Sequence, residues 1–163
     1  MQQIATKLTL EALGVDVKLQ EFDERLIVQK AIYLAQAAGV DRGYFFRWYL
    51  RGPYSPELTR DVFGIRAEIV ADPDADESQD WALDGETIKR LNKVACLVPA
   101  AETASKARKL ELLASVHFLV SRRQVPTDDV DALVQLLRRY GKDFLDREVA
   151  DALSELRDNG LLS

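Results

Sequence analysis

Residues 26–38 read LIVQKAIYLAQAA, a run that would be apolar on almost every side of a helix. A helix of that kind lies inside a domain, because a surface helix keeps one polar face. Asp23 is placed to cap its first turn, and Gly39 follows its end, where glycine is the usual terminating residue. We therefore expect a central, buried helix from about Asp23 to Gly39, with the rest of the chain packed around it.

The few polar residues of this helix are arranged with a helical period. Gln29, Tyr33 and Gln36 fall at i, i+4 and i+7, so they share one stripe. Lys30 is the other exception to the apolar pattern. A polar stripe on a helix that is otherwise buried marks these four residues as candidates for a specific role.

Residues 44–50 follow and read YFFRWYL. Their aromatic content and alternation predict a short β-strand or hairpin. One face of the strand would carry Tyr44, Phe46, Trp48 and Leu50. The other face would carry Phe45, Arg47, Tyr49 and Arg51. Arginine and tyrosine on an exposed face are typical of interface hot spots and of base-stacking surfaces. Packing of both faces into the core is the alternative, and the sequence leaves it open.

Short polar signals divide the rest of the chain into helices. Gly52 and Pro53 predict a turn, and Ser55 before Pro56 predicts a capped helix start. Further helices are expected over about 2–13, 85–98 and 106–121, and residues 127–159 predict a helix pair resembling a helix-turn-helix. Residues 72–84 are expected to be an acidic loop. The fold class is mainly α: a compact helical bundle with one short β-strand or hairpin at about 44–50, forming one domain over residues 1–163.

Composition excludes several classes of function. The chain has 163 residues and a net charge of −5, so it has no general attraction for nucleic acid or anionic lipid. Its single cysteine, Cys96, lies in an apolar run and is expected to be buried and inert. His117 is the only histidine, which excludes a usual catalytic triad or a histidine metal pair, and it is expected to be a hydrogen-bonded core residue. We expect no catalytic site, no cofactor and no enzyme.

Two further patterns bear on the location of the protein and on whether it binds a metal ion. The first residues are interrupted by polar ones and no run approaches 18 apolar residues, so we expect neither a signal peptide nor a membrane span, and a cytoplasmic protein. Asp72, Asp74 and Asp76 have the spacing that opens a calcium-binding loop. Glu77 then replaces the required glycine and Leu83 the closing glutamate, so no metal site is predicted.

Two segments together resemble a known family. They are QKAIYLAQ (residues 29–36) and FRWYLRGPYSPEL (residues 46–58). They resemble the signature of the Panacea (SocA-like) antitoxin domains and, more closely, that of the YwgA-like proteins. DarG-type antitoxins carry a similar domain. The resemblance covers residues 23–63. It implies a helical binding module from toxin–antitoxin, phage or defence systems, whose partner is a protein such as a toxin encoded nearby. The matching residues are Gln29, Lys30, Tyr33, Gln36, Gly52, Pro53, Tyr54 and Ser55.

Two hypotheses of function follow. The first is a non-enzymatic binding module, antitoxin-like or defence-associated, that binds and regulates a protein partner. Its expected partner-binding residues are Gln29, Lys30, Tyr33, Gln36, Arg47, Tyr49, Arg51, Tyr54 and Ser55. The alternative is a small DNA-binding transcriptional regulator that uses the C-terminal helix pair. Residues 127–163 carry more acidic than basic side chains, which disfavours nucleic acid, although a basic cluster is available at Lys106, Arg108, Lys109, Arg122 and Arg123.

Overall fold

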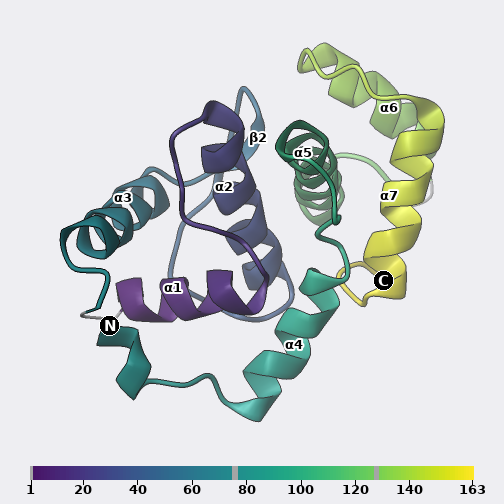
Figure 1. Cartoon of the computed structure of the whole chain (residues 1–163). Coiled ribbons are helices and arrows are strands. Elements are labelled where there is room, and N and C mark those ends of the chain that lie inside the picture. The colour runs from purple at the N-terminus through teal and green to yellow at the C-terminus, as the bar shows by residue number, and fades with distance from the viewer. Residues whose placement is uncertain (1, 75–76, 127–128) are drawn as a thin grey trace.

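Helices α2 (Phe22–Ala37) and α5 (Thr103–Ser121) form the centre of the molecule and pack against each other (Figure 1). Every residue of α2 from Leu26 to Ala35 is buried, as is every residue of α5 from Leu110 to Val120. The central position predicted for the first of these helices is therefore confirmed. A helix that is apolar all round needs neighbours on every side, and these two provide the main neighbour for each other.

The computed structural model describes residues 2–74, 77–126 and 129–163. Within them it is mainly helical with one small antiparallel hairpin, as expected. The remaining elements are α1 (Gln2–Ala12), β1 (Arg47–Tyr49), β2 (Gly52–Tyr54), α3 (Pro56–Ala71), the 3₁₀ helix η1 (Glu77–Asp80), α4 (Gly85–Ala95), α6 (Val130–Arg139) and α7 (Asp146–Asp158). Helices α1, α3 and α4 lie on the α2 side of the centre, while α7 covers α5 and carries α6 (Figure 1).

The hairpin is shorter than the strand predicted for residues 44–50. Its strands pair from Arg47 with Tyr54 to Tyr49 with Gly52, and residues 50–51 form the turn. The alternation holds for Tyr44 and Phe46, which are buried, and for Phe45, which is exposed. It fails at Leu50, which is 90% exposed. The prediction for Leu50 was wrong because the residue lies in the turn, where side chains no longer alternate between two faces.

Local signals at the helix ends are partly confirmed. Ser55 caps α3, since its Oγ accepts a hydrogen bond from the Leu58 amide at 3.3 Å. Asp23 does not cap α2. The helix starts earlier, with Glu21 at the cap position, and the Glu24 carboxylate accepts from the Glu21 amide at 3.0 Å. Glu21, Asp23 and Glu24 are all acidic, so the sequence did not distinguish which of them would cap the helix.

The structure differs from the predictions for Cys96 and for the acidic loop. Cys96 is exposed rather than buried, because Val94 and Leu97 occupy the inward positions of that turn. The segment 72–84 contains the short helix η1, so it is not wholly a loop. Asp76 of the calcium-like pattern, and Thr127 at the expected start of the C-terminal pair, lie outside the described residues.

Candidate functional site

The Gln29 side chain is joined to the backbone at the end of the hairpin. Its Nε2 donates to the Ser55 carbonyl at 2.8 Å, and its Oε1 accepts from the Ser55 amide at 3.0 Å. The same Nε2 lies 2.8 Å from the Thr59 hydroxyl, to which it donates. Gln29 therefore satisfies both backbone groups of a residue that is fully buried and lies where β2 leads into α3.

Gln36 does the same at the other end of this segment. Its Oε1 accepts from the amides of Arg42 and Tyr44, at 3.2 and 3.0 Å, and its Nε2 donates to the Tyr44 carbonyl at 2.9 Å. The two glutamines are 7 positions apart, about two turns of α2. Together they fasten both ends of the segment from Arg42 to Ser55 against the helix.

Lys30 lies between these anchors and is only 1% exposed. Its Nζ donates to the Pro53 carbonyl at 2.7 Å. Removal from water lowers the pKa of Lys30 to about 7, while the charge of Glu111 acts in the opposite direction and that of Lys142 adds to the lowering. Lys30 thus joins β2 to α2, although its charged form loses the water that would solvate it at the surface.

Glu111 and Lys142 form a second buried polar contact beneath the hairpin. The Lys142 ammonium lies 3.0 Å from the Glu111 carboxylate and donates to the Leu50 carbonyl at 2.8 Å. The hairpin is therefore held at its turn by Lys142, which Glu111 of α5 positions, and at β2 by Lys30 of α2. Neither Glu111 nor Lys142 belongs to a sequence motif, so the sequence did not predict this ion pair.

Tyr33 joins α2 to α5. A 2.7 Å hydrogen bond connects its hydroxyl with Nδ1 of His117, and its ring contacts Phe46 edge-on. Burial lowers the pKa of His117 and raises the pKa of Tyr33, so both side chains are neutral near pH 7. The prediction of a hydrogen-bonded core histidine is confirmed.

The polar stripe of α2 is thus directed inward. Gln29, Lys30, Tyr33 and Ser55, all expected to contact a partner, are buried and bonded within the chain. Gln36, half-buried, is also bonded internally. The expectation that these side chains reach a partner directly does not fit this placement, because they are buried or half-buried and bonded within the chain. Their effect on the surface is to position the hairpin.

The outer side of the hairpin has the opposite character. Arg47, Tyr49 and Arg51 are all exposed, and Tyr54 is half-buried. The Arg47 guanidinium lies over the Phe45 ring at 5.2 Å, and Tyr49 meets Tyr54 edge-on with ring centroids 5.2 Å apart. The structure therefore separates the predicted residues into an internal set on α2 and an exposed set on the hairpin.

A pocket of about 580 Å³ opens beside this exposed set. It lies between the first turns of α2, the hairpin and α3. Its lining residues are Phe22, Arg25, Leu26, Gln29, Lys30, Tyr49, Leu50, Arg51, Gly52, Tyr54, Thr59 and Phe63. A volume of this size is typical of ligand sites, and most of the lining is apolar.

Sequence reasoning missed Phe22, Arg25 and Phe63 as members of a site. Phe63 is 45% exposed although it is a large aromatic residue on a helix whose inward stripe is Leu58, Val62 and Ile65. An aromatic residue outside the apolar stripe of its own helix was the available signal. The contribution of Phe22 and Arg25 depends on how α2 meets the hairpin, which no local pattern encodes.

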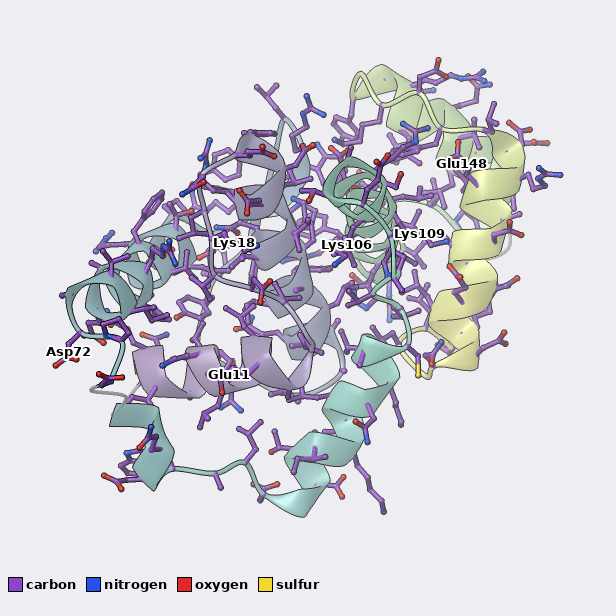
Figure 2. The ribbon with its side chains drawn as sticks, in the orientation of Figure 1. Glu11, Lys18, Asp72, Lys106, Lys109 and Glu148 are labelled. Atoms are coloured by element: carbon purple, nitrogen blue, oxygen red, sulfur yellow. The ribbon has the colours of Figure 1, made fainter. Side chains whose placement is uncertain are left out.

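The basic cluster proposed for DNA is partly neutralised by α7. Arg108 pairs with Glu148 at 3.0 Å, and Lys109 pairs with Glu155. Figure 2 shows Lys106 and Lys109 along α5, with Glu148 on the neighbouring α7. These contacts join the helices to each other and leave Lys106, Arg122 and Arg123 as the other members of the cluster.

The described residues offer neither a membrane-spanning helix nor a cluster of metal ligands. Within residues 2–74, 77–126 and 129–163, none of the helices has the length and apolar character needed to cross a membrane. The same ranges contain no group of three or more histidine, cysteine, aspartate or glutamate side chains that could hold a metal ion.

In comparisons with known proteins, no family model, curated protein or solved structure matches the chain.

Proposed function

We propose that this protein is a non-enzymatic binding module, antitoxin-like or defence-associated, that binds and regulates a protein partner. The contact region is the hairpin surface, which consists of Phe22, Phe45, Arg47, Tyr49, Leu50, Arg51 and Phe63. The observation that carries the proposal is the exposure of this surface: Leu50 is 90% exposed, Phe45 60% and Phe22 52%.

Exposed apolar side chains gathered on one surface favour binding over simple packing. A monomeric protein rarely leaves a large contiguous apolar patch in water unless it is used for contact. The arginines add planar groups that stack on rings and also bind carboxylates. Arg51 lies 5.5 Å from the Phe22 ring centre, and Arg47 is placed in the same way over Phe45. This combination is enriched in binding hot spots.

The rigid support beneath the surface also favours a contact role. Side-chain bonds from Gln29, Lys30, Gln36 and Lys142 hold the backbone of the segment from Arg42 to Ser55. A surface that is ordered before binding loses less entropy when the partner arrives. The residues that resemble the Panacea and YwgA-like signature would then serve the interface indirectly, by holding it in shape.

The proposal is tested by direct binding to the proteins encoded beside this gene. Each neighbouring product is co-expressed with the tagged chain, and the affinity of any pair that co-purifies is measured by calorimetry. Leu50→Asp places a charge at the exposed turn and should abolish the complex. Leu145→Asp makes the same change at a 67% exposed leucine before α7, and should leave the complex intact.

Either of two results would overturn the proposal. One is that none of the neighbouring products binds. The other is that a stable pair forms and Leu50→Asp binds as tightly as Leu145→Asp. Circular dichroism on both variants verifies that each remains folded, as expected for substitutions at exposed positions.

A further inference from the structure

The pocket beside the hairpin is basic, although the chain is acidic. The chain has 27 acidic and 22 basic residues. The charged residues that line the pocket are nevertheless Arg25, Lys30 and Arg51, with no carboxylate among them. The acidic residues Asp23 and Glu24 lie in the same first turn of α2, yet they do not line it. The pocket is therefore a local region of positive charge on a negatively charged molecule.

The polar groups on the floor of the pocket are already occupied. Lys30 donates to Pro53, and Gln29 is bonded to Ser55 and Thr59. A ligand could use the Gln29 carboxamide only by breaking these buried bonds, which is unfavourable. Lys30 is only 1% exposed, so little of it faces a ligand. The floor residues thus shape the pocket, and a charged ligand would be recognised by the side chains at its rim.

The two arginines at the rim keep their charge available. Among the described residues, the ion pairs of the structure involve neither Arg25 nor Arg51. Arg25 donates to the carbonyls of Leu19 and Gln20, which fixes its position without neutralising its charge. Both guanidinium groups lie within about 6 Å of the Phe22 ring centre, at 6.0 and 5.5 Å. A fixed guanidinium beside an apolar wall is suited to a carboxylate next to an apolar group.

The apolar walls are open to an occupant. Phe22, Tyr49, Leu50 and Phe63 all line the pocket, and each is at least 44% exposed. Beyond the pocket the same kind of surface continues along β1, where Arg47 covers the exposed ring of Phe45. A small molecule would fill the pocket and leave this continuation uncovered, whereas an extended peptide segment would cover both.

We propose that the pocket binds an acidic, apolar peptide segment of the partner, inserting a leucine or phenylalanine side chain between Phe22, Leu50 and Phe63 while adjacent aspartate or glutamate side chains pair with Arg25 and Arg51. This inference rests on the proposed function and specifies the chemistry of the partner. The partner segment thus matches the pocket in both its apolar and its charged parts.

The test uses synthetic peptides and does not depend on knowing the partner. Three N-acetylated, C-amidated peptides are titrated into the ¹⁵N-labelled full chain and followed by NMR. The first is Asp-Leu-Phe-Asp-Glu, the second its charge-reversed form Lys-Leu-Phe-Lys-Lys, and the third Asp-Ala-Ala-Asp-Glu, which lacks the apolar side chains. The first peptide should shift the backbone amides of Leu26, Leu50 and Gly52. It should bind about tenfold or more tightly than either of the others, because both parts of the recognition are required.

Two variants locate the carboxylate contact. Arg51→Glu should weaken the first peptide about tenfold or more and should strengthen the charge-reversed one, since the sign of the rim charge is inverted. Arg147→Glu makes the same change at an exposed arginine of α7, a helix that packs against α5 and α6, and should leave both affinities unchanged. Both arginines are exposed, so neither variant is expected to unfold the chain.

Several results would overturn the inference. They are equal binding of the acidic and basic peptides, shifts confined to amides outside the pocket, and binding of benzoate alone as tightly as the first peptide. Shifts of the pocket amides with protein concentration alone would mean that a second copy occupies the pocket. If the neighbouring gene product binds in a Leu50-dependent way while the peptides fail in any of these ways, the peptide chemistry is wrong and the proposed function stands.

Discussion

The Gln29 carboxamide pairs with the Ser55 backbone as a neighbouring strand would, donating to its carbonyl at 2.8 Å and accepting from its amide at 3.0 Å. Gln29→Ala leaves the buried Ser55 amide without a partner, while the Ser55 carbonyl still accepts from the Thr59 amide at 3.3 Å. An unpaired buried group costs about 1–3 kcal/mol, so we expect the free energy of unfolding to fall by about that amount. Urea denaturation measures the loss. Gln20→Ala, at an exposed position, is the control, and an equal small effect of both changes would show that the pairing does not stabilise the fold.

Gly52 is required by backbone conformation and by space. Its φ is +90°, and an added Cβ would lie 2.5 Å from Ser115 Oγ. We expect Gly52→Ala to lower the free energy of unfolding by more than the roughly 1 kcal/mol attributed to the backbone alone. Gly14→Ala isolates that backbone contribution, because its φ is +70° and nothing lies within 4 Å of its added Cβ. Equal losses in the two variants would show that the contact with Ser115 is absent.

The Ser115 hydroxyl is buried and has no hydrogen-bond partner among the described residues. Removing an unsatisfied hydroxyl eliminates its desolvation cost, so Ser115→Ala should leave the free energy of unfolding unchanged or raise it by up to about 1 kcal/mol. The same substitution should reduce the loss caused by Gly52→Ala. A double-mutant cycle on the two positions measures this coupling, and strictly additive effects would contradict the prediction.

Lys30 predicts a dependence of stability on pH. Burial lowers its pKa from 10.5 to about 7. Between these values the unfolded chain binds one more proton than the folded chain, so stability rises as the pH increases. The slope approaches about 1.4 kcal/mol per pH unit at most. Below the lowered pKa the residue is charged in both states and contributes no slope.

Urea denaturation at about pH 7, 8 and 9 measures this effect below the ordinary tyrosine pKa of about 10. Above that pH the raised pKa values of Tyr33 and Tyr44 act in the opposite direction. Lys30→Met should remove the slope, and Lys18→Met, at an exposed lysine, should retain it. A slope that persists in Lys30→Met would assign it to another group.

Substitution of Arg47 and Arg51 tests whether these residues form a binding surface or pair within the chain. Among the described residues, the ion pairs of the structure include neither Arg47 nor Arg51. The double variant Arg47→Ala, Arg51→Ala should therefore change the free energy of unfolding by less than about 0.5 kcal/mol. Its affinity for the partner should fall by about 2 kcal/mol or more.

Thermal denaturation and calorimetry on the same double variant separate the two roles. Arg139→Ala with Arg147→Ala is the matched control, at two exposed arginines of the C-terminal pair. A lower melting temperature with unchanged partner affinity would mean that Arg47 and Arg51 stabilise the fold and do not form the contact surface.

The sequence alone determined the features that depend on neighbours along the chain. The apolar run of α2 predicted a buried helix that ends before Gly39, and the dipeptide Ser55–Pro56 predicted the start of α3. Alternation in YFFRWYL placed Tyr44 and Phe46 inside and Arg47 and Tyr49 outside. These predictions held because helical period, capping and strand pleating are set by a few consecutive residues.

Only the tertiary structure decided where the polar stripe of α2 points and which residues form the pocket. Gln29 meets Ser55 across 26 positions, and Tyr33 meets His117 across 84. Such pairs form only when α2, α5 and the hairpin pack together, and no local pattern specifies that packing. The same packing left Leu50 and Phe63 in solvent beside Arg51, producing the pocket. The periodicity of α2 identified its polar stripe, whereas the structure showed that these residues hold the hairpin segment from beneath.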